Sequence, residues 1–303
     1  MTYLVLVSIL WAFSFGLIKQ RLVAADPFVV AFLRLAVSCL VFLPWLRPAR
    51  LAPALRRRCF AWGAIQFGLM YVLYTAAFRD LTAAAVAVLT VLTPLYVALL
   101  DDVRARRVRG RRLVAAALAV VGAAVVVWRG GGEAPAWRGA LLVQGANLCF
   151  AAGQLAYRDL ARRGPGGGRT PTDGPAEATL TAWMYLGAAV CTGLLALLLA
   201  DPARLAPLRA PGAWTALLYL GLLPTALGFH LWNRGAARVT AGLLAVANNL
   251  KVPLGVLGAW FVFGETVARG RTAIGLVLVL TALMLARERG EAAVASRPPD
   301  TVA

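Results

Sequence analysis

The sequence predicts an all-α membrane protein that crosses the bilayer with ten transmembrane helices, arranged as two inverted five-helix repeats. Of its 303 residues, 61% are hydrophobic, and the mean hydropathy is +0.75, which excludes an ordinary soluble domain of this size. Apolar windows of about 17–23 residues, each long enough to cross a bilayer as a helix, follow one another along the chain. The connections between these windows are short and rich in Pro, Gly and Arg.

The ten apolar windows give the expected helices in chain order. They lie at about residues 3–20, 28–46, 59–78, 82–100, 112–128, 138–157, 179–200, 213–233, 240–263 and 271–287. The first five form the first repeat (1–130) and the next five form the second (131–288). The connection from Arg158 to Glu177 contains GPGGGRTPTDGP, which is typical of a flexible linker. We expect the small, polar tail at 289–303 to be disordered and cytoplasmic.

The distribution of positive charge predicts an orientation. The net charge is +18, but the arginines lie between apolar windows rather than on a soluble basic face, so we expect no nucleic-acid partner. With the N-terminus in the cytoplasm, the cytoplasmic loops hold about twice as many Lys and Arg residues as the outer loops, which is the bias that orients multi-pass proteins. The sequence therefore predicts a multi-pass protein of the plasma membrane (a bacterial inner membrane) with both termini in the cytoplasm.

The apolar window at 240–263 carries polar residues at its middle, where Asn248, Asn249 and Lys251 precede Pro253. A charge at the centre of a membrane helix costs about 2.5–3.5 kcal/mol on insertion scales, so it is kept mainly where it faces protein or a watery cavity. Proline also frees a backbone carbonyl one turn upstream. We predict a substrate-binding site in which Lys251 binds an anion or carboxylate and the two amides orient it. The alternative is a structural role, in which the Lys251 ammonium only donates hydrogen bonds to backbone carbonyls that lack a helical partner.

The two halves of the chain carry matching features. The fourth expected helix, LTAAAVAVLTVLTPLYVALLDD, and the ninth, VTAGLLAVANNLKVPLGVLGAWFVFGE, share an early threonine, small residues and a mid-helix proline, Pro94 or Pro253. A repeat with an odd number of helices enters the membrane in the opposite sense the second time. This gives the inverted repeat typical of alternating-access transporters, in which the interrupted helices mark the binding region and are candidates for gating.

Several motifs of this chain belong together. They are WAFSFGLIK from Trp11 to Lys19, the run from Asp26 to Arg34, the Ala- and Thr-rich helix with Pro94, Gly264-Glu265 after the proline helix, and Gly275. The set resembles the EamA-type branch of the drug/metabolite transporter superfamily. The resemblance covers about residues 3–287 and implies the ten-helix fold and the transport of small metabolites, without naming a substrate. It also implies that Arg34 is structural or near the permeation path, and that Glu265 orders the turn between the last two helices.

The chain departs from the family pattern in two places. Asp101-Asp102 stands where the family often has Gly-Glu, and among so many arginines we expect these acids to pair locally. NNLK before Pro253 is more polar than the usual apolar run. The second departure is the one that would distinguish this protein from its relatives.

Other helices carry polar and aromatic residues that are candidates for cavity walls. These candidates, drawn from the first, third, sixth and seventh expected helices, are Trp11, Gln66, Tyr74, Gln144, Asn147 and Trp183. As a group they predict an amphipathic organic substrate. Interhelical hydrogen bonding is the alternative for the amides, and packing or interfacial anchoring is the alternative for the aromatic residues.

Two basic residues have open roles. Arg34 lies about one and a half turns into the second expected helix, and snorkelling to the outer interface is the alternative to a place on the permeation path. His230, the only histidine, is a candidate for titration during transport, with packing near the inner interface as the alternative.

The motifs that are missing also bear on function. No Asp or Glu lies at the middle of an expected helix, where proton- or sodium-coupled carriers commonly place a carboxylate. We therefore expect exchange, facilitated movement, or coupling through Lys251 or His230. We expect no enzyme, because the chain lacks HExxH, GxSxG and a membrane-buried Asp pair. The four dispersed cysteines predict no metal site, and no cofactor is expected.

The sequence thus predicts a transporter of small organic metabolites that works by alternating access. An exporter of amino acids or related carboxylate-bearing solutes fits the intramembrane lysine best. Exchange of a phosphorylated or nucleotide-linked sugar is one alternative, although a single midplane cation is a weak match to a multiply charged ligand. A non-transporting membrane scaffold is the other. The expected partners are the small-molecule substrate and the lipid bilayer, and a homodimer remains open.

Overall fold

The protein is all-helical throughout the part of the chain that the structure describes, as the sequence predicts. The computed structural model describes residues 2–106, 109–128, 136–162, 174–236, 241–265 and 269–286. Within these ranges every regular element is an α-helix or a short 3₁₀- or π-helical segment. The expected tail at 289–303 and most of the expected linker lie outside them.

The elements up to residue 128 follow one another with short connections. They are α1 (Thr2–Arg21), α2 (Pro27–Phe42), η1 (Leu43–Trp45), η2 (Pro48–Arg50), α3 (Pro53–Gly63), the π-helical η3 (Ala64–Leu69), α4 (Met70–Ala77), α5 (Ala83–Leu89), the 3₁₀ segment η4 (Thr90–Leu92), α6 (Thr93–Arg104) and α7 (Gly110–Val127). Several consecutive elements form one bent rod, because α3, η3 and α4 continue into each other, as do α5, η4 and α6.

The elements from residue 137 onward also include consecutive helices that form continuous rods. Its elements are α8 (Trp137–Arg162), α9 (Gly174–Leu199), η5 (Pro202–Arg204), η6 (Ala206–Arg209), α10 (Pro211–Leu220), the π-helical η7 (Gly221–Leu227), α11 (Gly228–Ala236), α12 (Ala241–Leu257), the π-helical η8 (Gly258–Val262) and α13 (Arg269–Ala286). Here α10, η7 and α11 form one rod, and η8 extends α12.

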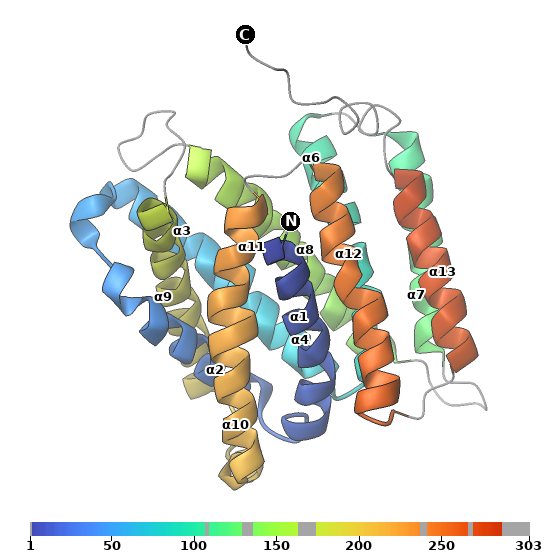
Figure 1. Ribbon diagram of the computed structural model, residues 1–303, viewed down its shortest axis with the longest axis horizontal. Helices are drawn as coiled ribbons and strands as arrows, with labels where there is room; N and C mark the ends of the chain where they lie inside the picture. Colours follow the sequence, from blue (N-terminus) through green and yellow to red (C-terminus); the bar gives the residue numbers. More distant parts are fainter. Residues whose placement is uncertain are drawn as a thin grey trace.

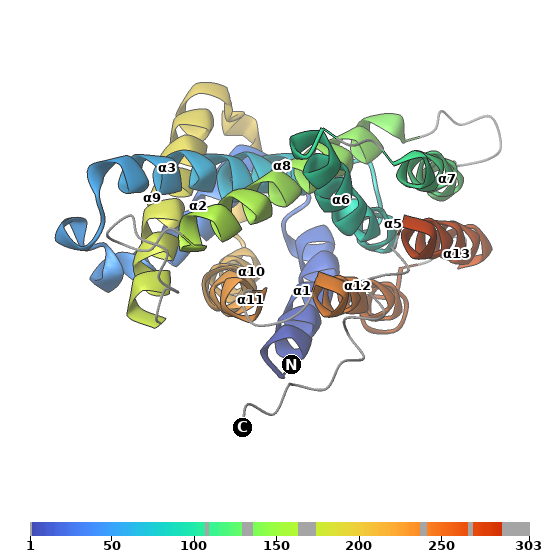
Figure 2. The same ribbon diagram turned by 90° about the horizontal axis from the view of Figure 1, so that it is seen from above.

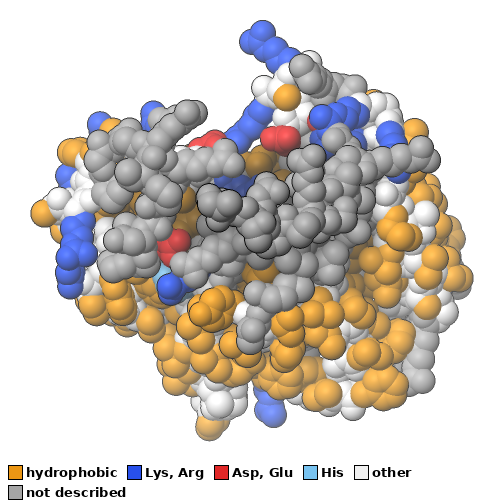
Figure 3. All heavy atoms as spheres, turned by 45° about the horizontal axis from the view of Figure 1, so that its top comes forward, with side chains coloured by type: hydrophobic (Ala, Val, Ile, Leu, Met, Phe, Trp, Pro, Cys, Tyr) orange, Lys and Arg blue, Asp and Glu red, His pale blue; other side chains and the backbone are white. Residues whose placement is uncertain are grey.

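Seven helical runs in the described part of the chain are long and apolar enough to cross a membrane. They are Tyr3–Arg21, Pro27–Trp45, Pro53–Ala77, Ala83–Arg104, Trp137–Ala161, Glu177–Leu199 and Pro211–Gly235. Large apolar side chains on the outside fit a lipid environment, since Leu197, Leu198 and Phe261 are 75–85% exposed. Figure 3 shows hydrophobic side chains over the flank of the molecule, with the Lys and Arg side chains in view mainly along its upper rim. A multi-pass membrane protein is therefore confirmed, whereas the number ten stays a prediction.

Helices that are distant in the sequence lie side by side. α13 packs along α7, α12 along α1, α9 along α2 and α3, and α8 along α4. Figures 1 and 2 show α1 at the centre, between the α10–α11 rod and α12, while the α7–α13 pair and the α3–α9 pair lie at opposite edges. Each of these pairs joins an early helix to a late one, so neither part of the chain forms a core of its own.

The close packing of α3 against α9 depends on two glycines. A Cβ at Gly63 would lie 2.0 Å from the carbonyl oxygen of Met184, and a Cβ at Gly187 would lie 2.0 Å from that of Phe60. Each glycine therefore receives the backbone of the other helix. Within a bilayer the hydrophobic effect does not drive helices to associate, and small residues at their interfaces let the backbones approach closely.

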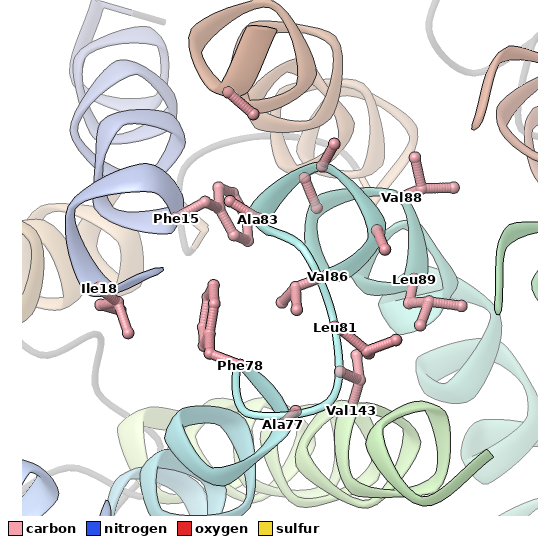
Figure 4. Packing of buried hydrophobic residues seen from close by; sticks show 14 of the residues in the cluster. Phe15, Ile18, Ala77, Phe78, Leu81, Ala83, Val86, Val88, Leu89 and Val143 are labelled. Carbon is pink, nitrogen blue, oxygen red and sulfur yellow. The ribbon is translucent and has the colours of Figure 1, made fainter. Parts of the chain in front are cut away.

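The short helix α5 is fully buried. All seven of its residues are buried, and four of them are alanines, which lets neighbouring helices pack closely against it. Figure 4 shows side chains from α1, from the segment before α5 and from α8 packed around it; those labelled include Phe15, Ile18, Phe78, Leu81 and Val143. A helix this enclosed holds the centre of the bundle in place.

Of the two acids at the end of α6, Asp102 shows the expected local charge pairing, whereas Asp101 is exposed and forms no ion pair with a described residue. Asp102 is 3% exposed and forms ion pairs with Arg112 and, at 3.8 Å, with Arg109. The pairing ties the end of α6 to the start of α7. It is structural and lies away from the cavity described next.

Candidate functional site

A cavity of about 70 Å³ lies where α1, α2, α4, α6, α8, α11 and α12 meet. Its walls are largely apolar and aromatic. The lining residues are Trp11, Ser14, Phe15, Arg34, Met70, Tyr71, Tyr74, Thr90, Thr93, Ala146, Asn147, Phe150, Phe229 and Lys251. Among the residues that the structure describes, the lining contains two cations and no carboxylate. In this conformation the volume holds only a few water molecules.

Lys251 supplies one of the two cations. The side chain is 7% exposed, and its Nζ atom donates to Asn248 Oδ1 at 3.1 Å. The same Nζ atom lies 4.9 Å from the ring centroid of Trp11 and 6.0 Å from that of Phe150. Aromatic faces attract an ammonium group, but they occupy none of its remaining N–H donors. Among the described residues Lys251 has no ion-pair partner, so it presents an uncompensated positive charge to the cavity.

The position of Lys251 follows from the local sequence of α12. Pro253 lies inside this helix, and because proline has no N–H, the carbonyl one turn upstream, that of Asn249, lacks its helical partner. Asn248 stands three residues before Lys251 and therefore on the same face. Its carboxamide nitrogen has no hydrogen-bond partner among the described residues. The helix thus carries several polar groups at one depth.

Arg34 supplies the second cation and is 2% exposed. Its Nε atom donates to Thr225 Oγ1 at 2.6 Å, and its guanidinium carbon lies 4.1 Å from the ring centroid of Tyr71. The expected alternative, snorkelling to the outer interface, does not describe this side chain, because it is buried against η7 and lines the cavity.

The π-helical segment η7 accepts hydrogen bonds from side chains of other helices. Trp11 Nε1 donates to the carbonyl oxygen of Pro224 at 2.9 Å, and the Tyr185 hydroxyl donates to that of Thr225 at 2.7 Å. Ser38 donates to the carbonyl oxygen of Gly221 at 2.8 Å. A π-helical turn loosens the regular ladder and often marks functional sites. The interruption at η7 was not predicted from the sequence, although the Gly221 to Pro224 spacing within an apolar window is the signal for such an interruption.

Asn147 replaces a backbone hydrogen bond that is lost at a second helix interruption, between α5 and α6. In the 3₁₀ segment η4 the N–H of Thr93 bonds to the carbonyl of Thr90, so the carbonyl of Leu89 loses its α-helical partner. Asn147 Nδ2 donates to that carbonyl at 2.9 Å, and Asn147 Oδ1 accepts from the Thr93 hydroxyl at 3.1 Å. Pro94 follows at once, in the first turn of α6. The predicted interruption of this helix therefore lies beside the cavity.

The structure brings some of the candidate residues together and separates others. Trp11, Arg34, Tyr74, Asn147 and Lys251 share the cavity. Asn248 and Gln144 lie one layer behind it, where they bond to Lys251 and Asn147 respectively. Asn249, on the adjoining face of α12, is not among the lining residues.

Three other candidates lie elsewhere. Gln66 is fully buried against Gly153, and neither of its amide atoms has a hydrogen-bond partner among the described residues. Trp183 lies beside Arg56, whose guanidinium carbon is 5.7 Å from its ring. Glu265 reaches across to the start of α5, where it accepts from the N–H groups of Ala83 and Ala84.

Sequence reasoning overlooked Phe229, Thr90 and Thr93 as lining residues. The two threonines are spaced three apart directly before Pro94, and this pattern is visible in the sequence. Phe229 has no such signal, because one phenylalanine in an apolar helix looks like any other.

The comparisons with known proteins agree with this architecture. A model of the EamA-like transporter family matches residues 1–128 and 137–287. The chain belongs to the EamA-like transporter family. It is therefore a small-molecule membrane transporter and not an enzyme.

Relatives within the family carry more specific names. A protein of Pseudomonas aeruginosa named "Probable biotin transporter" is 38% identical over 95% of this chain and 97% of its own length. The "Biotin transporter" of Escherichia coli is 34% identical, covering 85% and 83%. A "Probable amino-acid metabolite efflux pump" of Salmonella typhimurium is 26% identical, covering 92% of each chain. A solved crystal structure shares the fold with a TM-score of 0.64 at 20% identity, covering 97% of this chain and 98% of its own.

Proposed function

We propose that this protein carries a small carboxylate-bearing solute across the bacterial inner membrane, with biotin as its leading substrate. The observation that carries the proposal is the ammonium of Lys251, which has no ion-pair partner among the described residues and lies in an aromatic cavity whose described lining contains no carboxylate. A buried charge is stable when it is paired, and a substrate carboxylate supplies the missing partner. The names of the two biotin-transporting relatives support this substrate.

The chemistry of biotin matches the groups around the cavity. Biotin has a carboxylate on an aliphatic chain, and a compact bicyclic ring with a polar urea at the other end. The carboxylate suits Lys251, with Asn248 orienting the ammonium. The aliphatic chain and thioether ring suit aromatic walls such as Trp11, Phe150 and Phe229.

The transport mechanism is alternating access by ten transmembrane helices in two inverted repeats, residues 1–130 and 131–288, with both termini in the cytoplasm. Two findings support this architecture. The family model matches the chain twice, once in each part. The π-helical segments η3 and η7 interrupt the third and eighth expected helices, which are equivalent positions of a five-helix repeat. A cavity of about 70 Å³ is too small for a bicyclic vitamin, so substrate binding requires a wider conformation, which rocking of the repeats would supply.

Export of amino acids or their metabolites is the second candidate function. The efflux-pump relative supports it, at lower identity than the biotin-transporting relatives. Lys251 serves an amino-acid carboxylate equally well. An α-ammonium group would, however, have to lie in a cavity whose described lining already holds two cations and no carboxylate.

The test is transport by the purified protein in proteoliposomes. Vesicles loaded with unlabelled biotin should take up labelled biotin, and Lys251→Gln should reduce this uptake at least about tenfold, because it removes a charged hydrogen bond. Arg47→Gln is the matched control, since Arg47 is exposed in the α2–α3 connection and lies away from the cavity.

The outcomes separate the candidates. Uptake of labelled amino acids without biotin would favour the efflux function, and uptake of sugar phosphates alone would favour the exchanger. Vesicles that move none of these solutes would favour the scaffold. Biotin uptake that persists in a folded Lys251→Gln variant would assign Lys251 a structural role.

A further inference from the structure

A second buried cation of the cavity, Arg34, stays unpaired even when a substrate carboxylate binds Lys251. The guanidinium of Arg34 is buried on α2, and its Nη1 atom has no hydrogen-bond partner among the described residues. The described part of the cavity lining offers no carboxylate to pair with it. Arginine keeps its charge under all ordinary conditions, so this group needs an acceptor that the protein itself does not provide there.

The neighbours of Arg34 fix its orientation without satisfying it. A threonine hydroxyl offers one donor and two acceptor positions. Thr225 donates to the carbonyl oxygen of Leu220 at 2.7 Å and accepts from Arg34 Nε at 2.6 Å. The Tyr71 hydroxyl, 3.1 Å away, takes the remaining acceptor position. Thr225 is therefore saturated and has no capacity for the other N–H groups of Arg34.

The ring of Tyr71 holds the plane of the same guanidinium. The guanidinium carbon lies 4.1 Å from the ring centroid, a distance at which an arginine stacks on an aromatic face. One N–H is thus anchored and one face is covered, so the unpaired edge is held in one direction. A donor fixed in advance binds an acceptor without the entropy cost of ordering a long side chain.

We infer that Arg34 forms a second substrate subsite that binds the polar end opposite the carboxylate, namely the urea carbonyl of a biotin-like molecule. This inference rests on the proposed function for the identity of the ligand. The cavity is then bipolar, with Lys251 holding the carboxylate, Arg34 holding the carbonyl oxygen, and aromatic walls between them. A substrate with only one of the two polar ends satisfies only one of the two buried cations.

Three probes separate the two subsites in binding measurements on the purified full-length protein. Biotin carries both polar ends. Biotin methyl ester keeps the urea and masks the carboxylate, while octanoate keeps a carboxylate on an aliphatic chain and lacks the urea. Arg34→Gln should weaken the binding of biotin and of its methyl ester about 10- to 100-fold, the range for a hydrogen bond to a charged group. It should leave octanoate binding unchanged.

Lys251→Gln should give the opposite pattern, weakening biotin and octanoate while sparing the methyl ester. Thr225→Val provides a second route in case Arg34→Gln fails to fold, because it keeps the charge and removes the Nε anchor, together with the hydrogen bonds of Thr225 to Tyr71 and Leu220. It should weaken the methyl ester more than octanoate. Arg47→Gln is again the control and should bind all three probes as the wild type does.

The inference about Arg34 fails if Arg34→Gln binds the methyl ester as tightly as the wild type, or if it weakens octanoate as much as biotin. The second result would indicate that Arg34 binds the substrate carboxylate. Failure of the wild-type protein to bind biotin at all would instead overturn the proposed function, and the urea assignment with it.

Discussion

The carboxylate of Glu265, three residues beyond the end of η8, accepts a hydrogen bond of 2.7 Å from the backbone N–H of Ala83, the first residue of α5. Its second oxygen accepts from the N–H of Ala84 at 3.2 Å, and the hydroxyl of Thr82 accepts from that of Ala85 at 3.1 Å. The first N–H groups of a helix have no partner within the helix. A residue 182 positions away in the sequence therefore caps a fully buried helix of the bundle.

Removal of this cap should destabilise the protein. A carboxylate at a helix N-terminus satisfies orphan donors and interacts favourably with the helix dipole. We expect Glu265→Ala to lower the free energy of unfolding by about 1 kcal/mol, read as a lower thermal transition in detergent. Asp101→Asn, at an exposed carboxylate, should leave the transition unchanged. Equal transitions for Glu265→Ala and the wild type would contradict a capping role.

The glycine contact between α3 and α9 should not tolerate a methyl group. A Cβ at Gly187 would lie 2.0 Å from the carbonyl oxygen of Phe60, so Gly187→Ala forces the two helices apart. Overpacking of this kind costs about 1–3 kcal/mol or more. Gly258→Ala is the matched control, because a Cβ there meets nothing within 4 Å. Size-exclusion profiles and thermal unfolding should show a loss of folded protein only for Gly187→Ala.

The amide of Asn147 should stabilise the break between α5 and α6. Asn147→Leu keeps the size of the side chain but leaves the carbonyl of Leu89 without its partner. An unsatisfied buried group costs about 1–3 kcal/mol, so the variant should unfold at a lower temperature than the wild type. Gln144→Leu loses only the bond to Asn147 and should have a smaller effect. The idea is wrong if the two variants unfold alike.

Exchange of substrate should not require a proton gradient. No Asp or Glu is among the described residues that line the cavity, and intramembrane carboxylates are the common proton carriers of transporters. Proteoliposomes loaded with unlabelled biotin should therefore exchange it for labelled biotin at an unchanged rate after a protonophore is added. His230→Ala should behave like the wild type, because the imidazole lies outside the cavity and packs 5.3 Å from the ring of Phe42. Loss of exchange on adding the protonophore would overturn this expectation.

Helix ends show where hydropathy stops being informative. The third expected window begins at residue 59, but helix α3 begins at Pro53, because the arginine-rich turn before the apolar run is also helical. Likewise α8 extends to Arg162, beyond the expected residue 157. Apolar windows detect the part of a helix that lies in hydrocarbon, whereas backbone hydrogen bonding continues into the polar region.

The sequence by itself determined the all-helical membrane class, the family and the helix interruption at Pro94, because hydrophobic length and proline chemistry are local properties of the chain. The expected interruption at Pro253 is wrong, since this proline lies inside the continuous helix α12. It also marked Lys251, since an intramembrane charge stands out in any apolar window. Only the tertiary structure decided that Arg34 lies against Thr225, that Glu265 caps α5, and that Gln66 and Trp183 lie away from the cavity. Those outcomes depend on which helix faces meet, and contacts between residues nearly 200 positions apart leave no periodic signal in the sequence.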